Sequence, residues 1–174
     1  MTGNVQISAE LTFVRLRGIL SYFMDASQKY KIPLAILLAV ASRESNMGLS
    51  LSVAGTGDHG FGHGIMQVDV RHHPEFTDRH SALDYQANID YGAGFLAGLI
   101  RAFNGEIRPA IAAYNAGQSR VRMAVQAGLD PDYVTTGGDY AMDVLHRMET
   151  IEAMMGFSKA SSLAVYVIPA GLAV

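Results

Sequence analysis

The chain has 174 residues, of which 49% are hydrophobic and 17% charged, a composition typical of a folded domain and far from that of a disordered chain. The formal net charge of −3 argues against a nucleic-acid-binding protein, which would carry a basic surface. Cysteine is absent, so disulfides and thiolate metal sites are excluded. No basic region followed by an apolar core and a cleavage site opens the chain, so no signal peptide is visible.

The first half of the chain predicts two helices followed by a glycine-rich interruption. Apolar residues recur at helical spacing from Leu11, which predicts a helix capped by Ser8 and ending near Tyr30. Pro33 suits the first position of a second helix, which ends near residues 47–48. The six glycines between positions 48 and 64 then predict a loop with a short hairpin, and the alternation over residues 65–70 predicts a brief strand.

The second half predicts a polar loop and then helices. The loop covers residues 72–80, and Ser81 opens a long helix that ends at Phe103. Further helices are predicted over residues 109–114, 119–126 and 139–156, the last of them capped by Asp139. The apolar tail over residues 163–174 is interrupted by proline and glycine, and we expect a buried strand or docking tail there rather than a membrane anchor. With no repeat and no linker, we expect one α-rich domain over residues 1–174.

Glu44 is the first candidate for chemistry. Ile36, Val40 and Glu44 follow one another at every fourth position, so Glu44 continues the apolar stripe of its helix. Burial there and the partial negative charge of a helix C-terminus both predict a raised pKa. A carboxylic acid that is still protonated near neutral pH can protonate the leaving group of a glycoside. From position alone, a glutamate that turns to solvent or pairs with Arg43 is the alternative.

Three segments carry a resemblance to a known family. They are Ser-Arg-Glu-Ser at residues 42–45, the glycine-rich segment from Gly60 to Asp69 that contains Gly-Ile-Met-Gln-Val-Asp, and Ala-Ala-Tyr-Asn-Ala-Gly at residues 112–117. In this order they resemble the signature of goose-type lysozymes, and the soluble lytic transglycosylases share several of them. The start of the last helix, residues 139–144, also resembles the goose-type group. The resemblance covers about residues 33–150 and leaves the tail, about 157–174, unassigned.

The resemblance implies an α+β, mostly helical, lysozyme-like fold with a small β-hairpin beside the substrate cleft. It implies hydrolysis of the β-1,4 bond between N-acetylmuramic acid and N-acetylglucosamine, with Glu44 as the acid and with Asp58 and Asp69 holding the attacking water. In an inverting glycosidase the two carboxyl groups lie about 6.5–9.5 Å apart, which leaves room for that water. A turn residue at Asp58 and a strand-end cap at Asp69 are the structural alternatives.

The same resemblance implies five substrate-binding residues: Gln67, His73, Tyr114, Asn115 and Tyr140. It places Tyr114 near the acid, where its hydroxyl has a carboxyl as a possible partner; a backbone partner in the core is the alternative. Gln67 is expected to face an acetamido group, and His73 the sugar groove, although a plain surface histidine is equally consistent. Tyr140 is expected to play a part similar to that of Tyr114.

Neither a metal nor a cofactor is expected. His59, His63, His72 and His73 cluster in sequence, but the first two lie in a glycine loop without the fixed spacing that zinc ligands need. The resemblance implies the glycan strands of peptidoglycan as the partner and allows a proteinaceous lysozyme inhibitor as a second. We expect a monomer without nucleic acid or a stable membrane anchor, acting on the cell wall as a periplasmic, secreted or phage-delivered protein.

Three other functions stay open at this point. A lytic transglycosylase uses one glutamate and the substrate's own acetamido group, and it generally lacks water-holding aspartates, so Asp58 and Asp69 favour hydrolysis. The fold could also serve an inactive peptidoglycan-binding domain, which intact Glu44 argues against. A zinc-dependent amidase or peptidase is the third alternative.

Overall fold

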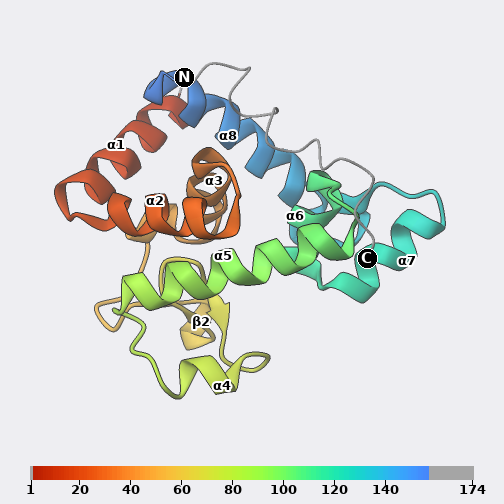
Figure 1. Cartoon of the computed structure of the whole chain (residues 1–174), viewed down its shortest axis with the longest axis horizontal. Coiled ribbons are helices and arrows are strands. Elements are labelled where there is room, and N and C mark those ends of the chain that lie inside the picture. The colour runs from red at the N-terminus through yellow and green to blue at the C-terminus, as the bar shows by residue number, and fades with distance from the viewer. Residues whose placement is uncertain (1, 157–174) are drawn as a thin grey trace.

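The computed structural model describes residues 2–156, which form helices and one small antiparallel sheet (Figure 1). The helices are α1 (Thr2–Leu16), α2 (Ile19–Tyr30), α3 (Leu34–Ser45), α4 (Pro74–Thr77), α5 (Tyr85–Ala102), α6 (Ile107–Ala116), α7 (Gln118–Gln126) and α8 (Tyr140–Met155). The strands are β1 (Thr56–Gly57), β2 (Gly62–His63) and β3 (Val68–Asp69), and four 3₁₀ turns are η1 (Asn46–Gly48), η2 (Asp58–Gly60), η3 (Pro131–Val134) and η4 (Thr136–Gly138). The mostly helical α+β fold is thus confirmed.

The segment expected to be one helix from Ser8 to Tyr30 is two helices, so that prediction was wrong. Helix α1 already begins at Thr2, which places Ser8 inside it. The chain then turns at Gly18, whose φ of 72° is in the left-handed region that glycine adopts without steric cost. Because of this turn, Val14 of α1 and Phe23 of α2, both fully buried, face the same core.

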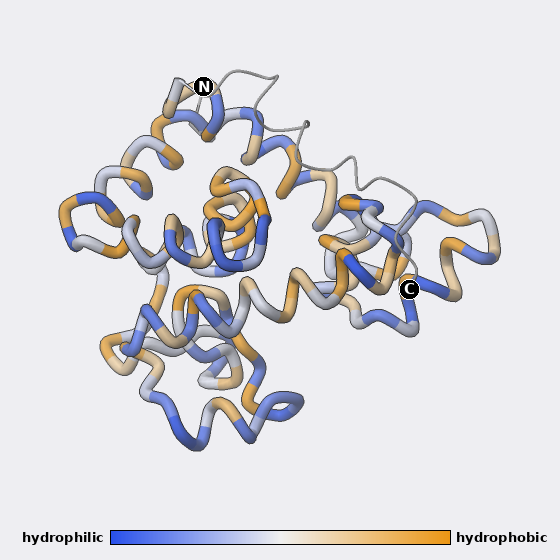
Figure 2. Tube along the Cα trace, viewed as in Figure 1, coloured by the Kyte–Doolittle hydropathy of each residue, from blue (hydrophilic) through white to orange (hydrophobic). Residues whose placement is uncertain are grey.

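Helix α3 is the centre of that core. Figure 1 shows it end-on, with α1, α2 and α8 around it, and Figure 2 shows that it is among the most hydrophobic parts of the chain. Its residues from Ala35 to Ser42 are all buried. Only near its C-terminal end do the partly exposed Arg43 and Glu44 interrupt this burial. The predicted second helix is confirmed, and it delivers Glu44 to the edge of the core.

The glycine-rich interruption forms a three-stranded sheet in the order β1-β2-β3, rather than a single hairpin. Gly57 pairs with Gly62, and Gly62 in turn pairs with Asp69, both in antiparallel register. The expected strand over residues 65–70 is shorter than predicted, because residues 64–67 make a turn in which Gln67 N–H donates to the Gly64 carbonyl at 3.1 Å. Asp69 therefore lies at the end of the last strand.

Two boundaries after the sheet also differ from prediction. The loop over residues 72–80 contains α4, which begins at Pro74, a residue well suited to a first helical position. Helix α5 begins at Tyr85 and not at Ser81, because Asp84 is the cap and accepts a hydrogen bond from Ala87 N–H at 3.0 Å. The later predicted helices correspond to α6, α7 and α8. The apolar tail at 163–174 lies outside the described residues.

Helix α5 runs between the helical part of the molecule and the sheet with α4 (Figure 1). Its buried Asn88 attaches the sheet: the side-chain oxygen accepts from Met66 N–H at 2.8 Å, and the amide nitrogen donates to the His63 carbonyl at 2.8 Å. A Cβ at Gly64 would lie 2.4 Å from this side chain, so only glycine permits the approach. Among the described helices, none is long and apolar enough to cross a membrane.

Candidate active site

Glu44 lies in the last turn of α3, and the following residue fixes that turn to the sheet. The Ser45 hydroxyl donates to the Ile65 carbonyl at 2.7 Å and accepts from Gly48 N–H at 2.9 Å. Asn46 and Met47 then adopt positive φ angles, which ends the helix abruptly. Glu44 is consequently held at a defined place between the helical core and the turn that precedes β3.

The carboxyl group of Glu44 is in an environment that favours its protonated form. Burial raises its pKa to about 7, although a hydrogen bond from Tyr140 and the charge of Arg43 act in the opposite direction. The buried Tyr140 hydroxyl donates to Oε1 of Glu44. The predicted increase in the pKa of Glu44 is confirmed, with burial as its leading cause.

This raised pKa has a consequence for folding. An unfolded glutamate ionises near its ordinary pKa of 4.5, whereas the folded protein keeps the proton until about pH 7, so stability is lost as the pH rises through this window. Glu44→Gln removes the ionisation, and we expect it to stabilise the fold by about 1–3 kcal/mol at pH 8 and by little at pH 4. Urea unfolding at both pH values measures the difference; an equal effect at both would contradict the buried-acid description.

A cavity of about 530 Å³ brings together five of the predicted residues. It is lined by Gln67, Val68, Asp69, Arg71, His72, His73, Tyr91, Gly92, Phe95, Ala113, Tyr114, Asn115, Ala116, Gly117 and Arg120. Glu44 is not in this lining, but its charge contributes to the raised pKa of Tyr114 in the wall. The cavity is therefore the candidate cleft, with the acid next to its tyrosine wall.

Only one of the two predicted tyrosines has the carboxyl partner that was expected for both. The Tyr114 hydroxyl donates to the Met66 carbonyl at 2.9 Å, so its partner is the backbone and not the acid. The carboxyl partner belongs to Tyr140 instead. A Cβ at Gly92 would lie 3.0 Å from the Tyr114 hydroxyl, which shows how closely α5 approaches this contact. Tyr114 thus joins α6 to the turn before β3, and Tyr140 joins α8 to the acid.

Asp69 is an ionised carboxylate held by one arginine. Arg71 donates to it through Nε at 2.9 Å, through Nη2 at 2.5 Å and through its backbone N–H at 2.8 Å. These hydrogen bonds hold the pKa of Asp69 well below its usual range. The structural alternative for Asp69, a carboxylate at the end of its own strand that accepts from a following backbone N–H, therefore describes its contact with Arg71.

Asp58 is not one of the residues that line the cavity, but it lies close to the same arginine. It is exposed, begins η2 with a φ of 43°, and its Oδ2 is 3.9 Å from Arg71 Nη2. The Arg71 guanidinium also lies over the Phe61 ring, 4.3 Å from its centre. Arg71 therefore connects the two aspartates. The sequence alone did not single it out, although a basic residue two positions after Asp69 was a visible signal.

Gln67 is folded back over the sheet. Its φ of 49° is in the left-handed region, and its amide nitrogen donates to the Gly64 carbonyl at 2.7 Å. A Cβ at Gly57 or at Gly62 would lie within 2.3 Å of the Gln67 side-chain oxygen, so both strands need glycine where this side chain crosses them. Gln67 borders the cleft and at the same time braces the sheet.

Aromatic rings form a row along the cleft. The Tyr91 hydroxyl donates its proton to Glu75 at 2.6 Å. It therefore accepts a hydrogen bond from His73 Nδ1, which lies 3.0 Å away. The ring centres of His73 and Phe95 are 5.0 Å apart, and those of Phe95 and Tyr114 are 5.5 Å apart. Tyr91 and Phe95 were not predicted; their spacing of four residues on one helix was the signal that could have identified them.

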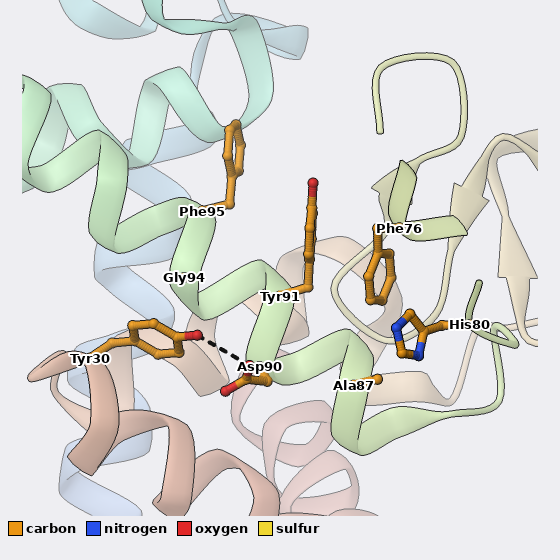
Figure 3. A pocket seen from close by; sticks show the side chains of 8 residues that line it. All are labelled: Tyr30, Phe76, His80, Ala87, Asp90, Tyr91, Gly94 and Phe95. Carbon is orange, nitrogen blue, oxygen red and sulfur yellow. Dashed lines mark hydrogen bonds between the residues drawn. The ribbon is translucent and has the colours of Figure 1, made fainter. Parts of the chain in front are cut away.

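A second cavity, of about 450 Å³, adjoins the first across Tyr91 and Phe95, which line both. Figure 3 shows its lining residues: Tyr30, Phe76, His80, Ala87, Asp90, Tyr91, Gly94 and Phe95. The Tyr30 hydroxyl donates to Asp90 at 3.1 Å, and Phe76 stacks on Tyr91 with ring centres 4.2 Å apart. The two cavities together give an open, aromatic surface that crosses α5.

The remaining predicted residue, Asn115, has a structural contact as well as a place in the cleft. Its side-chain oxygen accepts from Thr136 N–H at 2.8 Å, which ties the end of α6 to the start of η4. As for metals, residues 2–156 contain no group of three or more histidine, aspartate or glutamate side chains placed to hold an ion.

Comparison with known proteins identifies the family of this chain. The profile of the family described as "Lysozyme g" matches residues 5–150. A lysozyme g of Takifugu rubripes is 27% identical over 161 residues, covering 86% of this chain and 82% of the relative. One of Epinephelus coioides is 32% identical over 158 residues, with 82% and 79% covered, and one of Dromaius novaehollandiae is 31% identical over 131 residues, with 70% and 60% covered. The chain belongs to the lysozyme g family, a family of glycoside hydrolases.

Proposed function

We propose that the protein is a muramidase that cleaves the β-1,4 bond between N-acetylmuramic acid and N-acetylglucosamine in peptidoglycan, with Glu44 as the general acid. The observation that carries this proposal is the position of Glu44 at the edge of the core, near the Tyr114 wall of the cleft, where burial raises the pKa of its carboxyl to about 7. Such a group is protonated over much of the neutral range and can give its proton to the glycosidic oxygen as the bond breaks. The hydrogen bond from Tyr140 then stabilises the carboxylate that is left.

The attacking water is assigned to Asp58 and Asp69, on the sheet side. Direct attack by this water on the sugar makes the reaction inverting. Asp69, whose pKa is low, stays ionised and offers negative charge and acceptor oxygens, but it is a weak proton acceptor for the same reason. Asp58 is exposed and is 3.9 Å from Arg71, its salt-bridge partner. We therefore assign orientation of the water to Asp69 and acceptance of its proton to Asp58.

The glycan is proposed to lie along the aromatic row. His73, Phe95 and Tyr114 present ring surfaces to a sugar, and Gln67 and Asn115 border the same cavity with amide groups. Sugars beyond this cavity would continue past Tyr91 into the second one. The protein accordingly acts on the bacterial cell wall in this proposal.

Product analysis separates this function from its alternatives. Mass spectrometry of purified peptidoglycan after digestion is expected to show reducing muramic acid ends. A lytic transglycosylase would give 1,6-anhydro-muramic ends instead, and a zinc-dependent amidase would free peptides from the glycan and lose activity in chelator. If neither wild type nor Glu44→Gln released soluble products from the wall, the enzymatic proposal would fail and the binding-domain alternative would stand.

The pH dependence of the rate follows from the same carboxyl group. The acid must carry a proton, so kcat/KM is expected to be highest below the Glu44 pKa of about 7 and to fall tenfold per pH unit above it. Initial rates on soluble peptidoglycan fragments between pH 4 and pH 9 at constant ionic strength measure this limb. A rate that stays constant up to pH 9 would exclude Glu44 as the proton donor.

A further inference from the structure

Arg43, the residue before Glu44, is turned toward α8. Its Nη2 donates to Asp139 Oδ1 at 3.1 Å, and its Nη1 donates to Asp143 Oδ2 at 3.1 Å. Asp139 is at the N-cap position of α8, and Asp143 is in the first turn of that helix. One guanidinium of α3 therefore bridges two carboxylates that flank Tyr140 in sequence.

Two contacts link α3 and the start of α8, and their donors lie on opposite helices. Arg43 of α3 reaches the carboxylates of α8, while Tyr140 of α8 reaches the carboxyl of Glu44 in α3. The Arg43 guanidinium also lies 5.7 Å from the centre of the Tyr140 ring. Because Arg43 and Glu44 are adjacent on α3, and Tyr140 lies between Asp139 and Asp143 at the start of α8, a shift of α8 that breaks one contact also displaces the other.

Asp143 is anchored on a second side, deeper in the core. Arg147 Nε donates to Asp143 Oδ2 at 2.6 Å, and Arg147 Nη1 donates to the Ser42 hydroxyl at 2.9 Å. Ser42 in turn donates to Glu10 of α1, a carboxyl with no exposed surface. The side chains of Arg43 and Asp143 are only 27% and 26% exposed, so water screens their interaction less than that of a surface pair. Asp143 is thus the point where Arg43 joins a network that runs into the core.

We propose that Asp143 is a positioning residue for the reaction: through Arg43 it holds Tyr140 on the Glu44 carboxyl and keeps the Arg43 cation directed away from that carboxyl. This inference rests on the proposed role of Glu44. The groups that face Glu44 are Arg43 on its own helix, Tyr140 from α8 and Tyr114 from α6, with Asp139 and Asp143 behind Arg43.

Removing the negative charge of Asp143 affects both the support of Tyr140 and the direction of the Arg43 cation. In Asp143→Asn the Arg43 guanidinium loses one of its two anchors, and the carboxyl of the neighbouring Glu44 becomes its next acceptor. A cation close to Glu44 favours the carboxylate and lowers its pKa. The acid would then be deprotonated at the pH where the wild type works.

The test compares Asp143→Asn with Arg43→Gln, which are expected to move the Glu44 pKa in opposite directions. Asp143→Asn should lower kcat about tenfold at pH 7, leave KM within about twofold, and shift the basic limb of the pH–rate profile down by about one pH unit. Arg43→Gln should also lower kcat, because Tyr140 loses its support, but the limb should not move down. Asp143→Glu, which restores a carboxylate, should recover most of the rate.

A double-mutant cycle shows whether the effect passes through Tyr140. In a Tyr140→Phe background, Asp143→Asn should lower log kcat by less than about half as much as it does in the wild type. The reason is that the contact between Tyr140 and Glu44, which Asp143 supports, is already absent. Fully additive losses would overturn the proposal. The matched control is Asp130→Asn, which removes one of the two carboxylates that Arg108 bridges at η3, and it should leave the rate and the limb unchanged.

A readout without turnover separates this inference from the proposed function. The Glu44 carboxyl can be titrated by carbon-detected NMR in wild type, Asp143→Asn and Arg43→Gln, and its pKa should fall in the first variant and not in the second. This result supports the inference even if the protein proves not to be a muramidase. An unchanged Glu44 pKa in Asp143→Asn would overturn it, and should that variant fail to fold, a fall in the Glu44 pKa in Arg43→Gln would overturn it equally.

Discussion

Glu44→Gln is expected to lower the turnover of peptidoglycan by about 10²–10⁴-fold, the range that a general acid contributes. Glutamine keeps the size of the side chain and can still accept the hydrogen bond from Tyr140, but it has no proton to give to the leaving oxygen. Binding to purified wall should survive, because the cleft residues are untouched. Release of soluble fragments from the wall, together with a sedimentation assay for binding, measures both quantities.

The matched control for this variant is Glu149→Gln, the same change at an exposed position of α8. It should leave turnover within about twofold of the wild type, as a surface change away from the site does. If Glu44→Gln also retained a rate within tenfold of the wild type, the acid would have to be another residue.

Asp69→Asn is expected to lower the rate of hydrolysis by about 10²-fold or more. The variant removes the ionised carboxylate that is proposed to hold the water, and it also releases the guanidinium of Arg71. The rate should be measured together with the products, because a transglycosylase needs no such water and would lose little activity.

Arg71→Gln separates the two consequences of that change. It keeps the Asp69 carboxylate but removes the hydrogen bonds that hold its pKa down, so the pKa of Asp69 should return toward 3.8. The carboxylate stays ionised at neutral pH, so the rate there should fall less than in Asp69→Asn. The exposed Asp78→Asn, at the end of α4, is the control for a lost carboxylate near the sheet. Equal rates for Asp69→Asn and Asp78→Asn would remove Asp69 from the mechanism.

The parts of the site that local sequence determines were predicted well. Glu44 could be placed at the end of a buried helix because apolar spacing, Pro33 and the following glycine-rich stretch all act within the segment itself, and its raised pKa follows from that burial. The order of the later helices followed in the same way from glycines and caps. The helix break at Gly18 was missed because nothing local distinguishes it from a tolerated glycine inside a longer helix.

The contacts between segments could not be predicted from the sequence. Tyr114 is partly buried and Tyr140 is buried, both near the acid, and only the packing of α6 and α8 decides that the first bonds the Met66 carbonyl and the second bonds Glu44. Asn88 is a similar case, because its importance depends on the residues before β3 that the fold brings to it. Arg71 meets Asp69 locally, but only the fold brings Asp58 to it. Apolar spacing pointed to Glu44 and the family resemblance pointed to Asp58 and Asp69, whereas Tyr140, which contacts Glu44, comes from another helix.

The most direct test of the central claim is the titration of the Glu44 carboxyl itself, followed by carbon-detected NMR in the free protein and compared with the basic limb of kcat/KM. A midpoint of about 7 that coincides with this limb is the expected result, since burial holds the proton on the group that donates it. A midpoint near the ordinary value of 4.5, or a limb that does not follow the carboxyl, would contradict the assignment of Glu44 as the acid.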